Sequence, residues 1–211
     1  ADDASGDGYQ IERSLRFNNS DNPILKRTPS SSGNRRIWTF STWVKRGDLV
    51  SGNDIGSGVM RQMIFCAGDS SENGSIEFWG DSLTAFHHSS SSFQWQVTTN
   101  AKFRDLSAWY HIVVACDTNQ AVAADRLKLY VNGEQQTSFS TATYPAQFYS
   151  DNPYNEDNEI QSLGNYAGAN NFKYDGYYAD VYMIDGLQLS PAAFGSFDSL
   201  GVWNPKAFAL P

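Results

Sequence analysis

The sequence contains only two cysteines, Cys66 and Cys116, which excludes the disulfide framework typical of small secreted domains. Each of them ends a short apolar run, and free cysteine is often buried, so we expect two buried thiols rather than a bridge. No apolar run approaches the ~20 residues that a membrane-spanning helix needs. Residues 1–8 lack the basic start and apolar stretch of a signal peptide. We therefore expect a soluble chain with a flexible acidic lead-in and no membrane insertion.

Positive charge is also scarce. The chain has 15 Lys and Arg against 23 Asp and Glu, which gives a formal net charge of −8 at pH 7. A molecule of this charge repels the phosphates of nucleic acids and of anionic lipids. Nucleic acid is therefore excluded as the expected partner. The composition, with 40% hydrophobic and 18% charged residues, is that of a globular protein.

Helical periodicity is missing too, because no segment sustains it over three turns. The sequence contains instead a series of short alternating segments, such as Ile37–Val44 and Arg126–Val131, which predict half-buried strands. Trp109–Cys116 is nearly all apolar, as in a strand covered on both faces. Asn132-Gly133 predicts a type I′ hairpin turn. Ser190–Gly195 carries the one helical signal, a capped single turn.

Strands at this spacing without helices between them predict an all-β fold, an antiparallel two-sheet jelly-roll sandwich. The length of 211 residues suits one such domain, which we place at residues 9–200. The aromatic content of 14% is consistent with pleated sheets around a large core. Residues 201–211 carry few core signals and are predicted to be a tail or a connector.

Three ordered segments carry a family resemblance. They are the pair 109–114 and 127–133, the run Tyr174–Ile184 leading to Leu189-Ser190, and Ser14–Asn18 with Trp38–Val44. Together they resemble the laminin G-like, concanavalin A-like lectin/glucanase superfamily over residues 9–197. This resemblance implies the same jelly roll.

A narrower resemblance concerns Tyr9–Asn18, Arg27–Ser30, Gly33–Arg36 and Trp43–Arg46. These segments look like the version of the domain found in virion proteins of tailed phages, especially marine ones. The similarity implies a location on the virion surface. The fold alone does not choose a function, since the superfamily includes lectins, hydrolases and spacers.

Catalytic relatives place two or three carboxylates on one face of a strand, where one acts as an acid and another as a nucleophile. The nearest candidate is Glu156-Asp157-Asn158-Glu159, but strand alternation would put Glu156 and Glu159 on opposite faces. The segment also lies in a predicted loop. His87 and His88 point to opposite faces and cannot share a metal ion. We expect that the protein is not an enzyme.

The acidic loop 150–159 is the best set of oxygen ligands in the chain. Asp151, Asp157 and Glu159 are candidate Ca²⁺ ligands, because clustered carboxylates repel one another and a cation offsets that repulsion. The alternative is a solvated acidic turn. Calcium-binding pentraxin-like relatives carry ligands just after the strand matching residues 160–164, where this chain has Asn165-Tyr166-Ala167. Most of that ligand set is therefore missing here.

Aromatic residues in predicted loops are the candidates for recognition. Sugar rings present apolar faces that pack on aromatic side chains, while nearby polar groups bind the hydroxyls. The alternative is that these rings cover the edges of the sandwich or make subunit contacts. The candidates for glycan binding are Tyr144, Tyr149 and Tyr154 in the acidic loop region, and Phe93 and Trp95 after the serine run.

These observations favour a non-enzymatic virion-surface domain of a tailed phage, in a fibre, a spike or a capsid decoration, that binds glycans of the host cell. A second hypothesis is an assembly module that contacts capsid, tail or sibling subunits, with a homo-oligomer as one form. A third hypothesis is a glycan-degrading enzyme without the usual signature.

Overall fold

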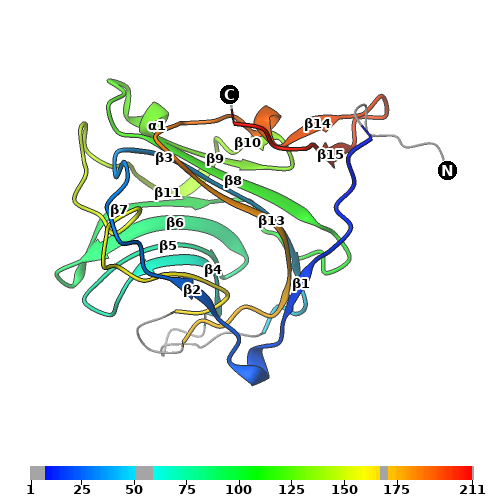
Figure 1. The fold of residues 1–211 in the computed structure, drawn as a ribbon, viewed down its shortest axis with the longest axis horizontal. Coiled ribbons are helices and arrows are strands. Elements are labelled where there is room, and N and C mark those ends of the chain that lie inside the picture. Colours follow the sequence, from blue (N-terminus) through cyan, green and yellow to red (C-terminus); the bar gives the residue numbers. More distant parts are fainter. Residues whose placement is uncertain (1–7, 51–58, 167–170, 211) are drawn as a thin grey trace.

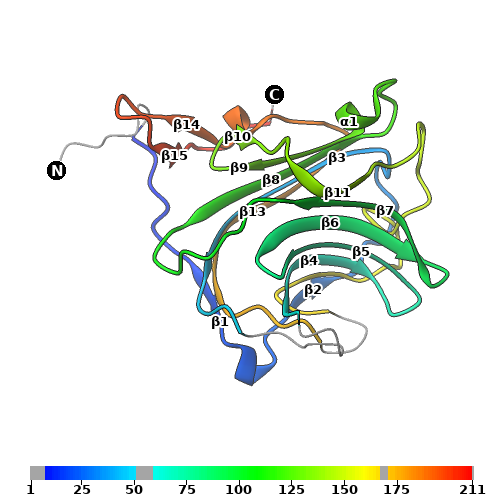
Figure 2. The ribbon, with the colours of Figure 1, turned by 180° about the vertical axis from the view of Figure 1, so that it is seen from behind.

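The computed structural model describes residues 8–50, 59–166 and 171–210. Two antiparallel sheets lie one over the other, and the seven-stranded sheet curves below the six-stranded one (Figures 1 and 2). The all-β sandwich predicted from the alternating segments is confirmed. In sheet order, the six strands are β1 (Leu15–Phe17), β13 (Gly176–Asp185), β3 (Ile37–Arg46), β8 (Tyr110–Asp117), β9 (Leu127–Val131) and β10 (Glu134–Gln135). The seven strands are β11 (Phe139–Thr143), β7 (Ser92–Thr99), β6 (Ser82–Ser89), β5 (Glu72–Trp79), β4 (Arg61–Gly68), β12 (Gln161–Leu163) and β2 (Leu25–Arg27).

The core lies between the two sheets and takes the inward residues of alternating strands. Trp38 and Phe40 of β3 belong to it, while Trp43 of the same strand lies on the other face, against His111. Strand β9 alternates between buried and half-buried positions as its sequence predicts. The first seven residues of β8 are all buried, because the strand is covered on both faces. Burying such side chains is the main stabilising term of the fold.

Short turns connect most of the strands. Asn132 and Gly133 have φ of 49° and 81°, the two positive values that a type I′ turn requires, so this prediction is confirmed. The helical signal near Ser190 corresponds to a single 3₁₀ turn, η2 (Pro191–Ala193). The other short helices are η1 (Asn19–Asp21) and α1 (Ala123–Arg126).

The C-terminal segment packs on the side of the six-stranded sheet that points away from the core. Strands β14 (Gly195–Phe197) and β15 (Trp203–Pro205) form a hairpin there (Figure 1). The Trp203 ring stacks on His111, and Phe208 packs against Phe194. The predicted tail is therefore part of the folded domain as far as residue 208.

Cys66 and Cys116 are both buried thiols and do not bridge to each other, as expected from their apolar flanks. No helix in the described part of the chain is long and apolar enough to cross a membrane.

Candidate functional site

Two of the predicted sugar-binding rings lie in the core, which corrects their assignment. Tyr154 is 0% exposed and Trp95 is 1% exposed. The Tyr154 ring stacks between Trp38 and Trp95, and its hydroxyl donates to the carbonyl of Phe86. Neither ring offers a face to a ligand at the surface. The alternative considered from the sequence, that loop aromatics fold back onto the sandwich, holds for both.

Tyr149 is half-buried in a three-residue hydrogen-bond network. Its hydroxyl lies 2.8 Å from His87 Nδ1, and His87 Nε2 lies 2.9 Å from a carboxylate oxygen of Glu72. The carboxylate can only accept, so Nε2 carries the proton and Nδ1 accepts from the tyrosine. Burial lowers the pKa of His87 to about 4 and raises that of Tyr149 to about 12, so both are neutral at pH 7. This network attaches the loop to β6 and leaves the tyrosine unactivated.

The remaining two predicted rings differ in exposure. Tyr144 is half-buried and packs against the core, with Phe139 in an edge contact at 6.5 Å between ring centroids. Phe93 lies at the start of β7 and is 42% exposed. Phe93 is therefore the predicted ring that is best placed to meet a ligand.

Arg35 makes two polar contacts with the acidic loop. Arg35 forms a 2.8 Å ion pair with Glu156 and donates to the carbonyl of Asn152. In the described part of the chain, no group of three or more His, Cys, Asp or Glu residues is arranged to hold a metal. The predicted Ca²⁺ ligands Asp151, Asp157 and Glu159 therefore do not come together as a ligand group. Asp157 is bound instead by Ser32 and Asn158.

We use the term outer face for the side of the seven-stranded sheet that points away from the six-stranded sheet. Arg61 and Glu77 lie there, and both carboxylate oxygens accept from the guanidinium, at 2.6 and 2.9 Å. The guanidinium lies over the rings of Trp79 and Phe172, at 4.4 and 4.1 Å from their centroids. Glu77 is 0% exposed. Burial raises its pKa, and the neighbouring Arg61 acts in the opposite direction.

Beside this ion pair the outer face carries a cluster of three rings, Trp79, Phe86 and Phe93, with centroids 5.2 to 6.4 Å apart. The positions next to it on β6, β7 and β11 are polar. Cross-strand register puts Phe86 opposite Gln96, and Thr84 opposite Thr98. Six of these residues together form what we call the outer-face patch: Trp79, Phe93, Gln96, Thr98, Thr141 and Thr143.

Sequence reasoning identified Phe93 but not the other members of this patch. The signal was present in Ser75–Trp79, where Glu77 and Trp79 share one face and Phe78 takes the other. Apolar and aromatic side chains on both faces of a strand indicate that the outer face is also covered in part. The threonines and Gln96 carry no comparable signal, because polar residues at alternate positions are ordinary in a strand with one wet face.

The sequence matches the concanavalin A-like lectin/glucanases superfamily, in its laminin G form, over residues 19–192. The chain belongs to this superfamily. The match covers most of the chain and includes both sheets, which agrees with the two-sheet topology. No curated protein matches the sequence.

Several solved structures share the fold at low sequence identity. A heptameric SAP-like pentraxin from Limulus polyphemus is 15% identical with a TM-score of 0.50, over 87% of this chain and 77% of that one. The mouse laminin alpha1 LG4-5 structure is 11% identical with a TM-score of 0.54, over 89% of this chain and 46% of that one. The enzymatically active domain of tailspike protein 2 of bacteriophage CBA120 is 11% identical with a TM-score of 0.51, over 80% of this chain and 25% of that one. The chain thus spans less than half of the laminin and tailspike chains, and these likenesses show the fold alone.

Proposed function

We propose that this domain is a non-enzymatic carbohydrate-binding module displayed on the surface of a tailed-phage virion, and that it binds host-cell glycans through the outer-face patch. The observation that carries the proposal is the exposed ring of Phe93 on a rigid sheet, beside hydroxyl and amide side chains at hydrogen-bonding positions. An apolar sugar face would pack on Phe93 and Trp79. Gln96 and the threonines would bind the sugar hydroxyls.

The support for the virion location comes from the resemblance of the N-terminal strands to phage virion proteins. The receptor-binding domain of botulinum neurotoxin type G shares the fold at 13% identity with a TM-score of 0.54, over 87% of this chain and 41% of that one, which is in keeping with a binding module. The tailspike structure is that of an enzymatically active domain, so it does not support the absence of catalysis. A fold shared with binding domains does not choose the ligand. The choice of a glycan rests on the composition of the patch.

The state of Glu77 supports a binding role rather than hydrolysis. A glycosidase needs one carboxyl group that donates a proton and a second that acts as nucleophile or base. Glu77 lies on the outer face, but it is buried and both of its oxygens accept from Arg61. Glu156 is likewise engaged by Arg35. A carboxylate that is shut off from the surface and whose two oxygens both accept from a guanidinium, as in Glu77, has no oxygen within reach of a glycosidic bond.

The test is an array of bacterial surface glycans, including O-antigens and capsular polysaccharides, followed by calorimetric titration of the best binder. Phe93→Ala should weaken that binding about tenfold, which corresponds to the loss of one aromatic contact. Phe148→Ala is the matched control, because Phe148 is a 53% exposed ring outside the patch. Its affinity should equal that of the wild type.

The proposal is overturned if the folded wild-type protein binds none of the glycans, or if Phe93→Ala and Phe148→Ala bind equally well. Release of reducing ends from a bound glycan would contradict the non-enzymatic part of the proposal alone.

A further inference from the structure

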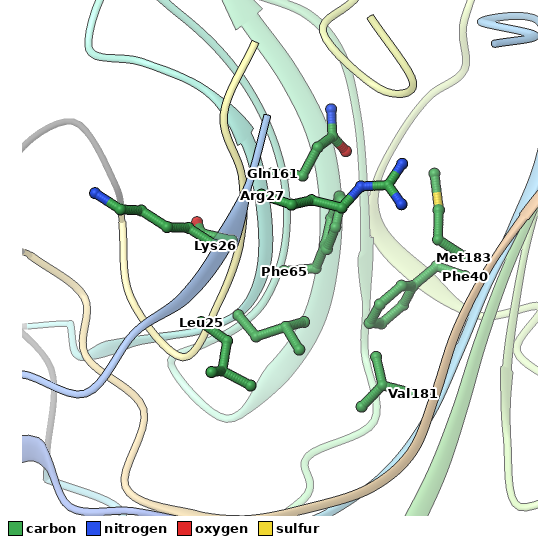
Figure 3. A pocket seen from close by; sticks show the side chains of 10 residues that line it. Leu25, Lys26, Arg27, Phe40, Phe65, Gln161, Val181 and Met183 are labelled. Atoms are coloured by element: carbon green, nitrogen blue, oxygen red, sulfur yellow. The ribbon is translucent and has the colours of Figure 1, made fainter. Parts of the chain in front are cut away.

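A groove runs along one lateral edge of the sandwich, between the β2 edge of the seven-stranded sheet and the β1 edge of the six-stranded sheet. It consists of two adjoining cavities of about 320 and 370 Å³ that share Leu25, Leu163 and Val181 as lining residues. Strands β2 and β12 form one wall, and β13 and β1 form the other. We call this feature the edge groove; Figure 3 shows the first cavity. It lies apart from the outer-face patch and does not depend on the function proposed above.

The lining of the edge groove is largely apolar and reaches the core. Phe40 and Phe65, both buried, contribute to the first cavity, and Phe17 and Tyr178 contribute to the second. Met183 completes the first cavity near Phe40 (Figure 3). A ligand that entered here would exchange water for contact with aliphatic and aromatic side chains.

A bulge in β13 shapes this wall. Ala179 pairs with Trp43 and Tyr182 pairs with Ser41, so Asp180 and Val181 together stand opposite a single residue of β3. Asp180 has φ of 46°, a conformation that non-glycine residues rarely adopt. A bulge of this kind redirects the side chains next to it. Val181, which lines both cavities, is left 37% exposed at the mouth of the groove.

The charged residues around the groove are mostly basic, although the whole chain carries a net charge of −8. Arg13, Lys26 and Arg27 line the two cavities together with one carboxylate, that of Asp180. Tyr9 donates a 2.7 Å hydrogen bond to Asp180. Within the described residues, the three cations take part in no ion pair. In Figure 3 the Arg27 guanidinium extends across the mouth of the cavity toward Met183, whereas Lys26 points away from it.

We propose that the edge groove binds a free alkyl carboxylate, with its aliphatic chain between the sheets and its carboxylate on Arg27. The chain would contact Leu25, Val181 and Met183, and the guanidinium would bind the carboxylate in the bidentate geometry that suits it. The combined volume lies within the range of small-molecule sites. A cation without an anionic partner at the mouth of an apolar groove complements a ligand that has one apolar and one anionic end.

A peptide strand or a second copy of the chain fits these features less well. The edge strands at this groove are β2 and β1, of only three residues each, and such short strands offer few backbone hydrogen bonds to an added strand. A second copy of the chain is acidic overall, so its charge would suit the basic residues of the groove. It would fill the cavities, however, only by inserting an apolar segment between the sheets. The modest volume of the two cavities and the Arg27 guanidinium beside the first one favour a small amphipathic anion.

The test is calorimetric titration of the whole chain with octanoate, decanoate and dodecanoate, all below their micellar concentrations. Each added methylene should tighten binding about fourfold until the chain fills the groove. Arg27→Gln should weaken decanoate binding about tenfold or more, while Lys26→Gln, the same loss of charge one residue away, should leave it unchanged. Decanol, which has no charge, should bind the wild type and Arg27→Gln equally. Val181→Asp should abolish the binding of every probe without changing the circular-dichroism spectrum.

Several outcomes overturn the proposal. They are the absence of saturable carboxylate binding, equal losses in Arg27→Gln and Lys26→Gln, or full binding in Val181→Asp. Sedimentation that shows a dimer dissociated by Val181→Asp would assign the groove to a second copy instead. Binding to phosphatidylglycerol vesicles in place of free carboxylates would assign it to a membrane surface.

Discussion

At the scale of single residues, Tyr154 shows how far a local pattern can be interpreted. Its neighbours Asp151, Asn152, Pro153 and Asn155 are turn formers, and the sequence predicted an exposed loop. The loop is there, but its ring enters the core and stacks on Trp38 with centroids 4.4 Å apart. Composition predicts that a segment is a loop, but which of its side chains reach the core depends on contacts distant in sequence. Phe93, by contrast, lies in strand β7 rather than in a loop, and its ring is 42% exposed because it is near the hairpin tip between β6 and β7.

We predict that Tyr154→Ala lowers the free energy of unfolding by about 3–5 kcal/mol, as removal of a fully buried aromatic ring does. Tyr154→Phe keeps the stack and loses only the hydroxyl that donates to Phe86, so it should cost about 1 kcal/mol. Urea denaturation monitored by tryptophan fluorescence measures both values. Losses of equal size in the two variants would mean that the hydrogen bond, rather than the ring, stabilises the loop.

At the scale of elements, the alternating strands and the Asn132-Gly133 turn could be predicted, since their signals lie within a few residues. The C-terminal hairpin could not. Trp203 packs flat on the backbone of two glycines, and a Cβ at Gly133 or Gly195 would come within 2.4 Å of its ring. Its indole N–H donates to His111 Nδ1 at 3.0 Å, across 92 residues of sequence. No pattern within residues 201–211 reveals a docking site so far away along the chain.

We predict that Trp203→Ala destabilises the domain by about 2–3 kcal/mol, because the half-buried ring packs on the six-stranded sheet. It should also make residues near Lys206 susceptible to trypsin. Trp203→Phe keeps part of the contact but removes the donor to His111, and we expect an intermediate loss. Limited proteolysis with mass spectrometry separates local release of the hairpin from global unfolding. Wild-type resistance in Trp203→Ala would show that the hairpin is attached by other contacts.

At the scale of the whole molecule, period-two burial predicts two sheets and a shared core, because each alternating strand must cover its apolar side. The same argument does not reveal which loops cover the outer face, nor that the lateral edge stays open as a groove. Both depend on the sheet order, in which β2 pairs with β12 rather than with a sequence neighbour. The predicted fold was therefore more complete than the predicted site. The bulge at Asp180, which shapes the edge groove, had no signal in the sequence.

Two buried histidines make global stability depend on pH. Burial lowers the pKa of His111 to about 3, and burial is also the main cause that lowers the pKa of His87 to about 4. Asp151 opposes this shift in His87, whereas Arg35 and His88 add to it. The unfolded chain, with an ordinary histidine pKa of 6.5, binds protons that the folded protein excludes. Stability is therefore fully present above pH 6.5 and falls as the pH decreases toward the folded values.

We predict that His111→Gln reduces this dependence by up to about 1.4 kcal/mol per pH unit between pH 6 and 4. Buried Glu77 and half-buried Glu156, whose pKa values are raised, act in the opposite direction, but they are common to both proteins and cancel in the comparison. Urea denaturation at a series of pH values supplies the slopes. Parallel profiles for His111→Gln and the wild type would mean that His111 has the same pKa in the folded and the unfolded protein, and the pH dependence would then have to come from other groups.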